Sequence, residues 1–519
     1  MQNINIKVNT NLNDLINEIK TVKPVKEFQT AIRKAVYKHS ILSEIIKSSD
    51  KIAFELYESD VSENETAIDD TKFKGKSTID DEEKVVIIIE QLLENIENID
   101  LGIGVENYNF YLYNKTYWEE IDEKITKTFL IEIAIKSGIK SSKARKKRFS
   151  DVLFNQFILS ASLPIDEKNA ESIKINLFNG TYRFDKGNRG VLGEPKKEDY
   201  FKYQLSFNYD PESKAEKFQI YLDEVLPDKQ SQKVLLEYCA YAFTNSLKIE
   251  KVLILYGTGA NGKSVFFEIL TALFGETNIS HYSMERLCDE NGYYRAKLGS
   301  KLLNYASEFG RISDMQMFKK LISCEPVEAR LPYKEPMTIS NYCKFIFNAN
   351  KLPEVEHTDA FFRRQIIIPF AVKIDEQKMD FNLSKKIIAT ELSGIFNLIL
   401  EGLDRLIMQG NFSTSETINN VLKNYRVESN SVALFLEEEN WITSNTKKTR
   451  LKDFYEDYKT YCRDSNQRPF ARPNFSKRLR EMNLTVESGT NHYTYVWVEK
   501  KSDTILLDPF SDFAKNILN

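Results

Sequence analysis

A glycine-rich octapeptide between two apolar segments is the part of the sequence best suited to chemistry. It runs from Gly257 to Ser264 with the pattern Gly-x-x-x-x-Gly-Lys-Ser, follows the β-prone residues 251–256, and precedes a helical apolar pattern that stops at Gly275. Glycines let successive backbone N–H groups turn toward phosphate oxygens, and the N-terminus of the next helix adds partial positive charge. The stretch predicts a P-loop for a nucleoside triphosphate; the alternative is a glycine-rich turn before an ordinary helix.

The residues of this loop have distinct expected contacts. Lys263 would reach the β and γ phosphates, and the hydroxyl of Ser264 would bind Mg²⁺. The residues expected to contact the nucleotide are Gly257, Thr258, Gly259, Ala260, Asn261, Gly262, Lys263 and Ser264.

Further polar positions follow the P-loop, each beside an apolar strand pattern. Glu308 ends one such segment and is suited to hold Mg²⁺ through water and to polarise the attacking water. Asn350 ends the next, where its amide could orient that water and sense the γ phosphate. Arg363 and Arg364 precede a third, where a guanidinium could neutralise transition-state charge. Each group also fits a structural interpretation, and their order after the P-loop is what favours one nucleotide site.

The composition is typical of a soluble globular chain. Its 519 residues exceed the size of one core and suggest roughly three to four domains. The five cysteines are scattered without a Cys-x-x-Cys pair, which argues against a disulfide framework or a zinc ribbon. There is no bilayer-length apolar run and no signal pattern, so we expect a cytoplasmic protein without a membrane partner. The net charge of −4 excludes a globally basic nucleic-acid coat but allows local basic surfaces.

Changes in composition divide the chain into four predicted parts. These are 1–84, a helical region with an acidic linker; 85–213, an α+β N-terminal domain; 214–410, the P-loop domain; and 411–519, a C-terminal domain. The linker starts near residue 58. Hairpins are predicted around Asn114 and at Asn179–Gly180. The basic run 143–148 fits a solvated helix face better than a nucleic-acid contact.

The C-terminal part has the pattern of a winged helix. Helices are predicted to begin near Ser431, Leu451 and Pro473, and a hairpin follows over about 484–498. The third helix is basic on the side not buried by its apolar residues, which suits the DNA major groove. Its basic residues are Arg472, Lys477, Arg478 and Arg480. The alternative is a structural cap with a solvated basic face.

Several short motifs together resemble one protein family. They are Asn179-Gly180-Thr181, Cys239 to Thr244, Gly257 to Ser264, Ala306-Ser307-Glu308, Glu328 to Lys334, Asn350 to Pro353, Phe362-Arg363-Arg364 and Glu391 to Ile395. With them the sequence resembles the phage and plasmid primase-helicase group, related to the poxvirus primase-helicase, within the superfamily three helicases of the AAA+ class. The resemblance runs from about residue 100 to the C-terminus and is most specific between about 235 and 405.

The resemblance implies an α/β fold with an AAA+ P-loop core, ATP and Mg²⁺ as cofactors, and a hexameric ring that moves 3′ to 5′ on single-stranded nucleic acid. The implied roles are Lys263 and Ser264 on phosphate and Mg²⁺, Glu308 as Walker B acid, Asn350 as sensor, and Arg364, with Arg363 a close second, as the finger reaching a neighbour's ATP. A hairpin from Val327 to Ile339 would track DNA, with Arg330 and Lys334 as contacts.

The chain departs from the family pattern at two places. Ser323-Cys324-Glu325 stands where many relatives have Gly-Gly-Asp, and Ser307 stands where many P-loop enzymes have a metal-binding Asp. A primase site is not expected either, because it needs clustered carboxylates on strands, usually with a nearby His. The one His before Cys239 is His39, and the acids at 69–70 and 80–81 fall in the predicted linker.

We therefore expect an ATP-driven replicative DNA helicase of a phage, plasmid or mobile genetic element. Its expected partners are single-stranded DNA, duplex origin DNA, further copies of the chain in a homo-hexamer, and a separate primase or loading protein. The alternatives are a P-loop small-molecule kinase, a non-enzymatic origin-binding initiator, and a P-loop ATPase without unwinding activity. ATPase activity measured with and without single-stranded DNA separates them.

Overall fold

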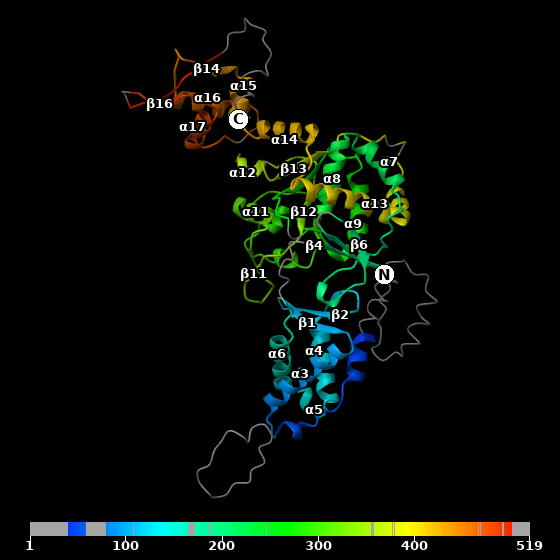
Figure 1. The fold of residues 1–519 in the computed structure, drawn as a ribbon. Helices are drawn as coiled ribbons and strands as arrows, with labels where there is room; N and C mark the ends of the chain where they lie inside the picture. The colour runs from blue at the N-terminus through cyan, green and yellow to red at the C-terminus, as the bar shows by residue number, and fades with distance from the viewer. Residues whose placement is uncertain are drawn as a thin grey trace. The chain divides into compact units, whose positions relative to one another are not determined.

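The structure is a computed structural model in which most of the chain is described. The described residues are 40–58, 79–106, 108–164, 172–185, 188–244, 247–353, 358–375, 377, 379–465, 467, 469–489 and 492–500. The helical pattern expected from residue 1 to about 57 lies outside these ranges up to residue 39, and of its described part residues 40–48 are helical. The acidic stretch 59–78 also lies outside these ranges. The chain divides into two compact units, Met1–Gln204 and Leu205–Asn519 (Figure 1). Among the described helices, none has the length and apolar character needed to cross a membrane.

The N-terminal unit packs helices against a small antiparallel sheet. A helix over residues 40–48 comes first among the described residues. It is followed by the 3₁₀ turn Phe54–Glu58, α3 (Asp81–Asn98), β1 (Gly102–Glu106), β2 (Asn109–Tyr113), β3 (Trp118–Ile121), α4 (Glu123–Lys136), α5 (Ser141–Ala144) and α6 (Lys147–Ser160). The strand order is β1-β2-β3, and Tyr113 lies opposite Trp118, so the hairpin predicted around Asn114 is present. Ile89, Leu112 and Phe157 are buried in the core that these elements share.

The acidic pair at 80–81 corrects the predicted extent of the linker. The side chain of Asp80 accepts hydrogen bonds at 2.8 Å from the backbone N–H groups of Glu82 and Glu83, and the Glu83 carboxylate accepts one at 3.0 Å from Asp80 N–H. This reciprocal cap starts α3, and Asp81 is its first residue. The helix signal was present in the sequence as Asp-x-x-Glu before an apolar run.

A second antiparallel sheet completes this unit. It contains β4 (Ser172–Leu177), β5 (Gly180–Asp185) and β6 (Asn188–Gly193). Leu177 pairs with Gly180, so the predicted hairpin is present, but its two-residue turn is at 178–179, one residue earlier than the predicted Asn179–Gly180. Gly180 has φ +142°, and a Cβ there would lie 2.6 Å from the carbonyl oxygen of Gly193. Glycine is needed at this position because a side chain would collide with the neighbouring strand.

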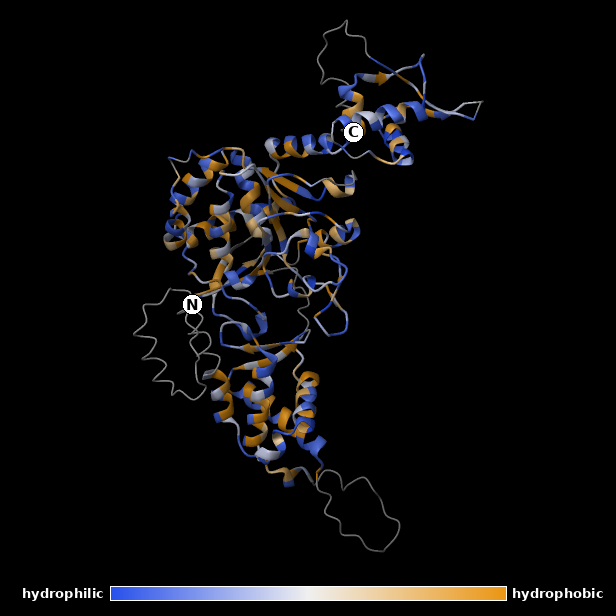
Figure 2. Ribbon diagram, turned by 180° about the vertical axis from the view of Figure 1, so that it is seen from behind, coloured by the Kyte–Doolittle hydropathy of each residue, from blue (hydrophilic) through white to orange (hydrophobic). Residues whose placement is uncertain are grey.

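The C-terminal unit is built on a five-stranded parallel sheet. Its strands are β7 (Val252–Tyr256), β8 (Ile279–Ser280), β9 (Leu303–Ala306), β12 (Lys344–Ala349) and β13 (Gln365–Pro369), in the order β13-β7-β12-β9-β8. Residues 252–255 are all fully buried, because helices cover both faces of a parallel sheet. Figure 2 shows the apolar colouring of these strands. The predicted α/β class with a parallel sheet is confirmed.

Helices pack around this sheet. They are α7 (Glu216–Val225), α8 (Lys229–Tyr241), α9 (Lys263–Phe274), α10 (Met284–Leu287), α11 (Met315–Ile322), α12 (Asp359–Phe362), α13 (Leu383–Gln409) and α14 (Glu416–Glu428). The long α13 packs on α7, α8 and α9. A Cβ on Gly402 of α13 would lie 3.0 Å from the Leu236 backbone, so the glycine allows close approach to α8. Buried Glu237 of α8 binds Arg405 of α13 at 3.0 Å.

The short hairpin expected between the strands of Glu308 and Asn350 is also present. It consists of β10 (Val327–Ala329) and β11 (Met337–Ile339), and Val327 lies opposite Ile339. These end residues are buried, whereas residues 332–336 at the tip are exposed.

The C-terminal part has its own aromatic core. Its elements are α15 (Ser431–Glu438), β14 (Trp441–Thr443), β15 (Thr449–Arg450), α16 (Leu451–Asp464), α17 (Arg472–Glu481), β16 (Val486–Ser488), β17 (Thr494–Val496) and β18 (Val498–Lys500). The three predicted helices and the hairpin are therefore present, with β15-β17-β16 as one sheet and β14-β18 as another. Phe435, Tyr458 and Phe475 meet in the core, where the Tyr458 and Phe475 ring centroids are 4.5 Å apart.

Candidate nucleotide site and nucleic-acid contacts

The segment Gly257–Ser264 joins the carboxyl end of β7 to the first turn of α9. Gly259 has φ +108°, and Gly262, which caps α9, has φ +86°. A Cβ on Gly257 would lie 2.5 Å from the carbonyl oxygen of Phe370. The glycines are thus required by left-handed backbone and by close packing, which leaves the loop backbone wrapped around the helix N-terminus.

Lys263 is held inside this loop. Its side-chain nitrogen donates hydrogen bonds to the Gly257 carbonyl oxygen at 2.7 Å and to Asn261 Oδ1 at 3.0 Å. Asn261 is itself fixed, since its Nδ2 donates to the carbonyl oxygen of Phe370 at 2.9 Å. Lys263 is only 6 % exposed, and burial lowers the pKa of its ammonium group. A buried cation whose acceptors are neutral oxygens favours an anionic ligand such as phosphate.

Helix α7 supports the loop from one side. The hydroxyl of Tyr221 donates a hydrogen bond to the Gly262 carbonyl oxygen at 2.9 Å, and Val225 packs so closely that a Cβ on Gly262 would lie 2.6 Å from its Cγ1. Helix α7 in turn is anchored by Glu391 of α13, whose carboxylate accepts hydrogen bonds from Lys217 and Phe218 N–H at 3.1 and 2.9 Å. The Glu391 motif therefore has a positioning role for the loop.

Glu308 and Asn350 follow neighbouring strands at the same edge of the sheet as the P-loop. Glu308 lies two residues beyond β9, Asn350 lies directly after β12, and both are exposed. Because β12 lies between β7 and β9 and all three run parallel, their carboxyl ends meet at one edge, where ligands of open α/β sheets bind. Tyr305 donates a hydrogen bond to Asn348 Oδ1 at 3.0 Å and ties β9 to β12 below these residues.

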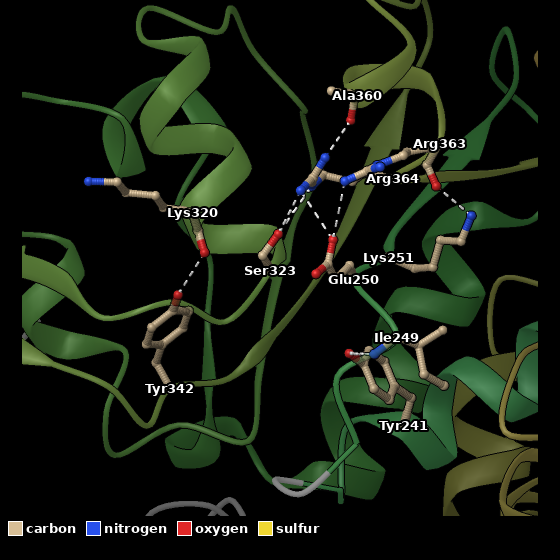
Figure 3. A network of polar contacts seen from close by, with 10 residues as sticks. All are labelled: Tyr241, Ile249, Glu250, Lys251, Lys320, Ser323, Tyr342, Ala360, Arg363 and Arg364. Atoms are coloured by element: carbon tan, nitrogen blue, oxygen red, sulfur yellow. Dashed lines mark hydrogen bonds and ion pairs between the residues drawn. The ribbon is translucent and has the colours of Figure 1, made fainter.

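The two arginines have different surroundings (Figure 3). Arg364 is 6 % exposed; its guanidinium donates hydrogen bonds to Ser323 Oγ at 2.9 and 3.2 Å and to the Ala360 carbonyl oxygen at 2.8 Å, and it pairs with Glu250 at 3.1 Å. The Arg363 side chain is 65 % exposed, and its nearest charged contact to Glu250 is 3.9 Å. Arg364 is thus bound within its own chain, whereas Arg363 projects into solvent.

The arginines lie at the opposite end of the sheet from the P-loop. In the register of β13 and β7, Gln365 pairs with Val252 and Pro369 pairs with Tyr256. Arg363 precedes the amino end of β13, while Gly257 follows the carboxyl end of β7. The strand between them spans roughly 17 Å, at about 3.3 Å per residue. An arginine side chain is too short to cover this distance within one chain.

The hairpin β10–β11 presents its polar tip on a fixed base. Buried Arg295 donates hydrogen bonds to the Glu328 carbonyl oxygen at 2.8 Å and to the Leu287 carbonyl oxygen at 2.9 Å, which anchors β10. At the tip, Lys334 is exposed, and Arg330 donates to the Lys334 carbonyl oxygen at 3.0 Å. No pattern in the sequence singles out Arg295, because its role depends on the carbonyl group of Glu328, which lies 33 residues later.

The basic face of α17 differs from the prediction at one residue. Lys477 is exposed and lies 3.7 Å from Glu481, and Arg480 is also exposed. Arg478 is only 7 % exposed, and its guanidinium lies 4.0 Å from the ring centre of Phe470. The expectation that Arg478 lies on the solvent side is therefore corrected. Arg478 comes three residues after Phe475 and directly before Leu479, so it shares the buried face of the helix with them.

Across the described residues, no group of three or more His, Cys, Asp or Glu side chains is placed to hold a metal ion. The acids at 69–70 lie outside those residues, so the expected lack of a primase site stays a prediction.

Comparison with known families matches two parts of the chain. Residues 98–227 match the family model described as D5 N terminal like. Residues 255–364, from the end of β7 to Arg364, match a family of unknown function (DUF5906). The first match supports the resemblance to phage primase-helicase-type replication proteins. Each match covers less than half of the chain.

Comparison with solved structures adds a weak likeness. One apo structure titled as the NrS-1 C terminal region shares 15 % identity and a TM-score of 0.47, covering 78 % of this chain and 97 % of that one. A second, of NrS-1 residues 305-718, shares 14 % identity and a TM-score of 0.47, covering 80 % and 99 %. TM-scores below 0.5 do not establish a shared fold. No curated protein matches the chain significantly.

Proposed function

We propose that the chain is an ATP-dependent DNA helicase of the superfamily three, AAA+ type, acting in replication of a phage, plasmid or mobile genetic element. It hydrolyses ATP with Mg²⁺ and moves 3′ to 5′ on single-stranded DNA as a homo-hexameric ring in the cytoplasm. The D5 N terminal like match supports a phage replication protein. The P-loop with its buried Lys263 supports the nucleotide chemistry.

The observation that carries the proposal is the separation of the P-loop from the exposed Arg363. The loop lies at the carboxyl edge of the sheet and Arg363 at the amino edge, so one chain cannot bring both to one phosphate. A ring of copies supplies the missing arginine from a neighbour and stabilises the charge on the transferring phosphate. We propose Arg363 as this finger, because Arg364 is bound to Glu250 and Ser323.

Within each site, Lys263 neutralises the β and γ phosphates and Ser264 holds Mg²⁺. Glu308 polarises the attacking water and, since Ser307 cannot bind metal as an Asp would, contributes to Mg²⁺ through water. Asn350 orients that water. The same proposal includes duplex origin DNA as a binding partner of the chain and a separate primase or loading protein as a protein partner.

A mixing experiment tests the assembly. Arg363→Ala and Lys263→Ala proteins should each lose about 10³-fold or more in ATPase rate, because one lacks the finger and the other the P-loop lysine. In a mixture, some interfaces pair an intact P-loop with an intact Arg363, so ATPase activity should partly return. Mass measurement with ATP and oligonucleotide should show hexamers.

Arg463→Ala, at an exposed position of α16, is the matched control and should keep wild-type ATPase activity. If the two inactive proteins co-assemble and the mixture remains inactive, Arg363 does not act in trans. Single-stranded DNA should also raise the ATPase rate of the wild-type chain; a rate that DNA leaves unchanged would favour a P-loop enzyme of another kind.

A further inference from the structure

The outer face of the C-terminal sheet carries a row of aromatic rings. Tyr493, Tyr495 and Trp497 alternate along the chain with Val496 and Val498, which are buried in the core of this region. Only Tyr495 lies within β17 (Thr494–Val496), and Tyr493 and Trp497 flank its two ends. Tyr495 and Trp497 share one cation, Lys448, and Tyr493 contacts Arg450 of the neighbouring strand, so the three rings lie next to one another. Tyr493 is 50 % exposed, and the other two rings are half-buried.

Two cations beside β17 complete this row. Arg450 of β15 lies opposite Tyr495. Lys448 comes two residues earlier in the chain, so its side chain points to the same face as that of Arg450. The guanidinium carbon of Arg450 lies 4.4 Å from the ring centre of Tyr493, and Lys448 Nζ lies 4.7 Å from that of Tyr495 and 5.4 Å from that of Trp497. These residues are called the aromatic strip: Tyr493, Tyr495, Trp497, Lys448 and Arg450.

The carboxylates next to the aromatic strip have partners of their own. Glu487 accepts a hydrogen bond from the indole N–H of Trp497 at 2.9 Å, which fixes the orientation of that ring. Glu499 pairs with Lys447 at 3.0 Å. Glu487 keeps its negative charge, because the indole N–H is a neutral donor. Lys448 and Arg450 rest against ring faces, so these two cations and Glu487 together leave one net positive charge for an anionic ligand.

We propose that the aromatic strip binds single-stranded DNA, with unpaired bases stacked on the rings and Lys448 and Arg450 moved onto the phosphates. The relative strengths of the two contacts favour replacement of the cation on each ring by a base. Stacking of a base on an aromatic side chain is a stronger contact than that of an exposed cation with a ring. The base therefore displaces the cation, and the cation gains a phosphate oxygen as its new partner.

Duplex DNA fits the aromatic strip less well than a single strand does. The faces of paired bases are covered by their neighbours in the duplex, so only backbone phosphates would meet the strip. Splayed single-stranded bases expose the faces that rings need. The inference rests on the proposed action of the chain on DNA, and it adds a single-strand site outside the hairpin β10–β11.

The test uses the full-length chain carrying Lys334→Ala, which weakens the contribution of the hairpin. Fluorescence anisotropy without nucleotide measures its affinity for a labelled oligothymidylate and for a blunt duplex of equal length. Adding Tyr493→Leu and Tyr495→Leu should raise the Kd for oligothymidylate at least about 5-fold and leave duplex binding unchanged, because stacking is lost. Lys448→Ala should lower the slope of log K against log salt by about 0.7. Phe381→Leu, at another exposed aromatic position, should change neither.

A cross-linking measurement covers the case in which these variants do not fold. Oligonucleotide containing 5-iodouracil, irradiated with the Lys334→Ala chain, should attach to the peptide that contains residues 493–497. Equal loss of single-strand and duplex affinity in folded variants, or no attachment to this peptide, overturns the proposal. Basal ATPase activity is measured in parallel: its loss in Lys263→Ala protein tests the ATPase proposal, and the oligothymidylate result is independent of it.

Discussion

Lys263 and Asn261 show how single residues of the P-loop divide their tasks. Asn261 joins the loop to the carbonyl group of Phe370 with one side-chain atom and holds the Lys263 ammonium with the other. Lys263 therefore stays near the helix N-terminus, and its side-chain acceptors among the described residues are neutral oxygens and not a carboxylate. The charge remains available for phosphate, and the lowered pKa of Lys263 reflects the burial that makes such a ligand favourable.

Substitutions of Lys263 and Glu308 should affect different steps of ATP hydrolysis. Lys263→Ala should reduce ATP hydrolysis to background while the chain stays folded, because the transferring phosphate loses its cation. Glu308→Gln should still bind ATP but turn it over slowly, since the attacking water loses its base. Radiolabelled-phosphate release and equilibrium binding of a fluorescent ATP analogue measure both. Lys297→Ala, on the exposed surface, serves as control; wild-type hydrolysis by Lys263→Ala protein would remove Lys263 from the site.

Substitutions of Arg363 and Arg364 should differ in whether they change ATPase activity or the free energy of unfolding. Arg364→Ala leaves Ser323 and Glu250 without their guanidinium partner, so it should lower the free energy of unfolding by about 2 kcal/mol. Arg363→Ala should leave stability unchanged and remove ATPase activity. Urea denaturation followed by circular dichroism, alongside the ATPase assay, makes the comparison. Equal stability of the two variants would contradict the structural role of Arg364.

Among the elements, the hairpin β10–β11 combines a fixed base with an exposed tip. Arg295 binds the Glu328 carbonyl group at its base, and residues 332–336 reach into solvent. A positive φ at Tyr333, +62°, marks the tight turn at the tip. The hairpin therefore holds its exposed tip at a fixed place relative to the sheet.

Lys334→Ala should uncouple ATP hydrolysis from DNA. The variant should lose unwinding and the stimulation of ATPase by single strands, because a phosphate contact is removed, while basal ATPase persists. A fluorescent forked-duplex assay and phosphate release measure the two quantities. Lys385→Ala, exposed on α13, is the control. Normal unwinding by Lys334→Ala protein would show that Lys334 is a solvated turn residue.

On the scale of the whole molecule, the chain presents its chemical groups in separate places. The P-loop and Arg363 lie at opposite ends of the strands of one sheet, and the proposed ring would bring the Arg363 of one copy to the P-loop of the next. Helix α17 offers Lys477 and Arg480 to solvent in the C-terminal part. A helicase needs sites for nucleotide, single strand and duplex, and the proposal assigns a different surface to each.

Duplex binding should depend on the exposed residues of α17. Lys477→Ala combined with Arg480→Ala should weaken duplex affinity and lower the slope of log K against log salt by about 2, since two phosphate contacts are lost. Arg478→Ala should instead lower the unfolding midpoint, because its stack on Phe470 is lost. Anisotropy titrations at several salt concentrations provide the slopes. Unchanged duplex affinity in the double variant would leave α17 as a structural cap.

The sequence by itself determined the features whose geometry is local. Strand β7, the loop Gly257–Ser264 and helix α9 are contiguous, so glycine freedom, β propensity and helical periodicity are sufficient to predict them. The hairpin of β4 and β5 and the helices of the C-terminal part follow for the same reason, although the turn of the hairpin lies one residue before the predicted one. Asp80 was misplaced in a linker although its capping pattern was readable, because the acidic composition around it dominated the prediction.

Tertiary structure decided which of several similar basic residues is exposed and can contact a ligand. Two adjacent arginines look alike in sequence, yet Arg364 is buried against Ser323, which lies 41 positions earlier, and Arg363 is exposed. Arg478 likewise turns toward Phe470. The strand order that places Glu308 and Asn350 beside the P-loop is also non-local. Local patterns fix backbone conformation, but exposure and neighbours depend on contacts between residues distant in the chain, and these form only when the whole sheet packs.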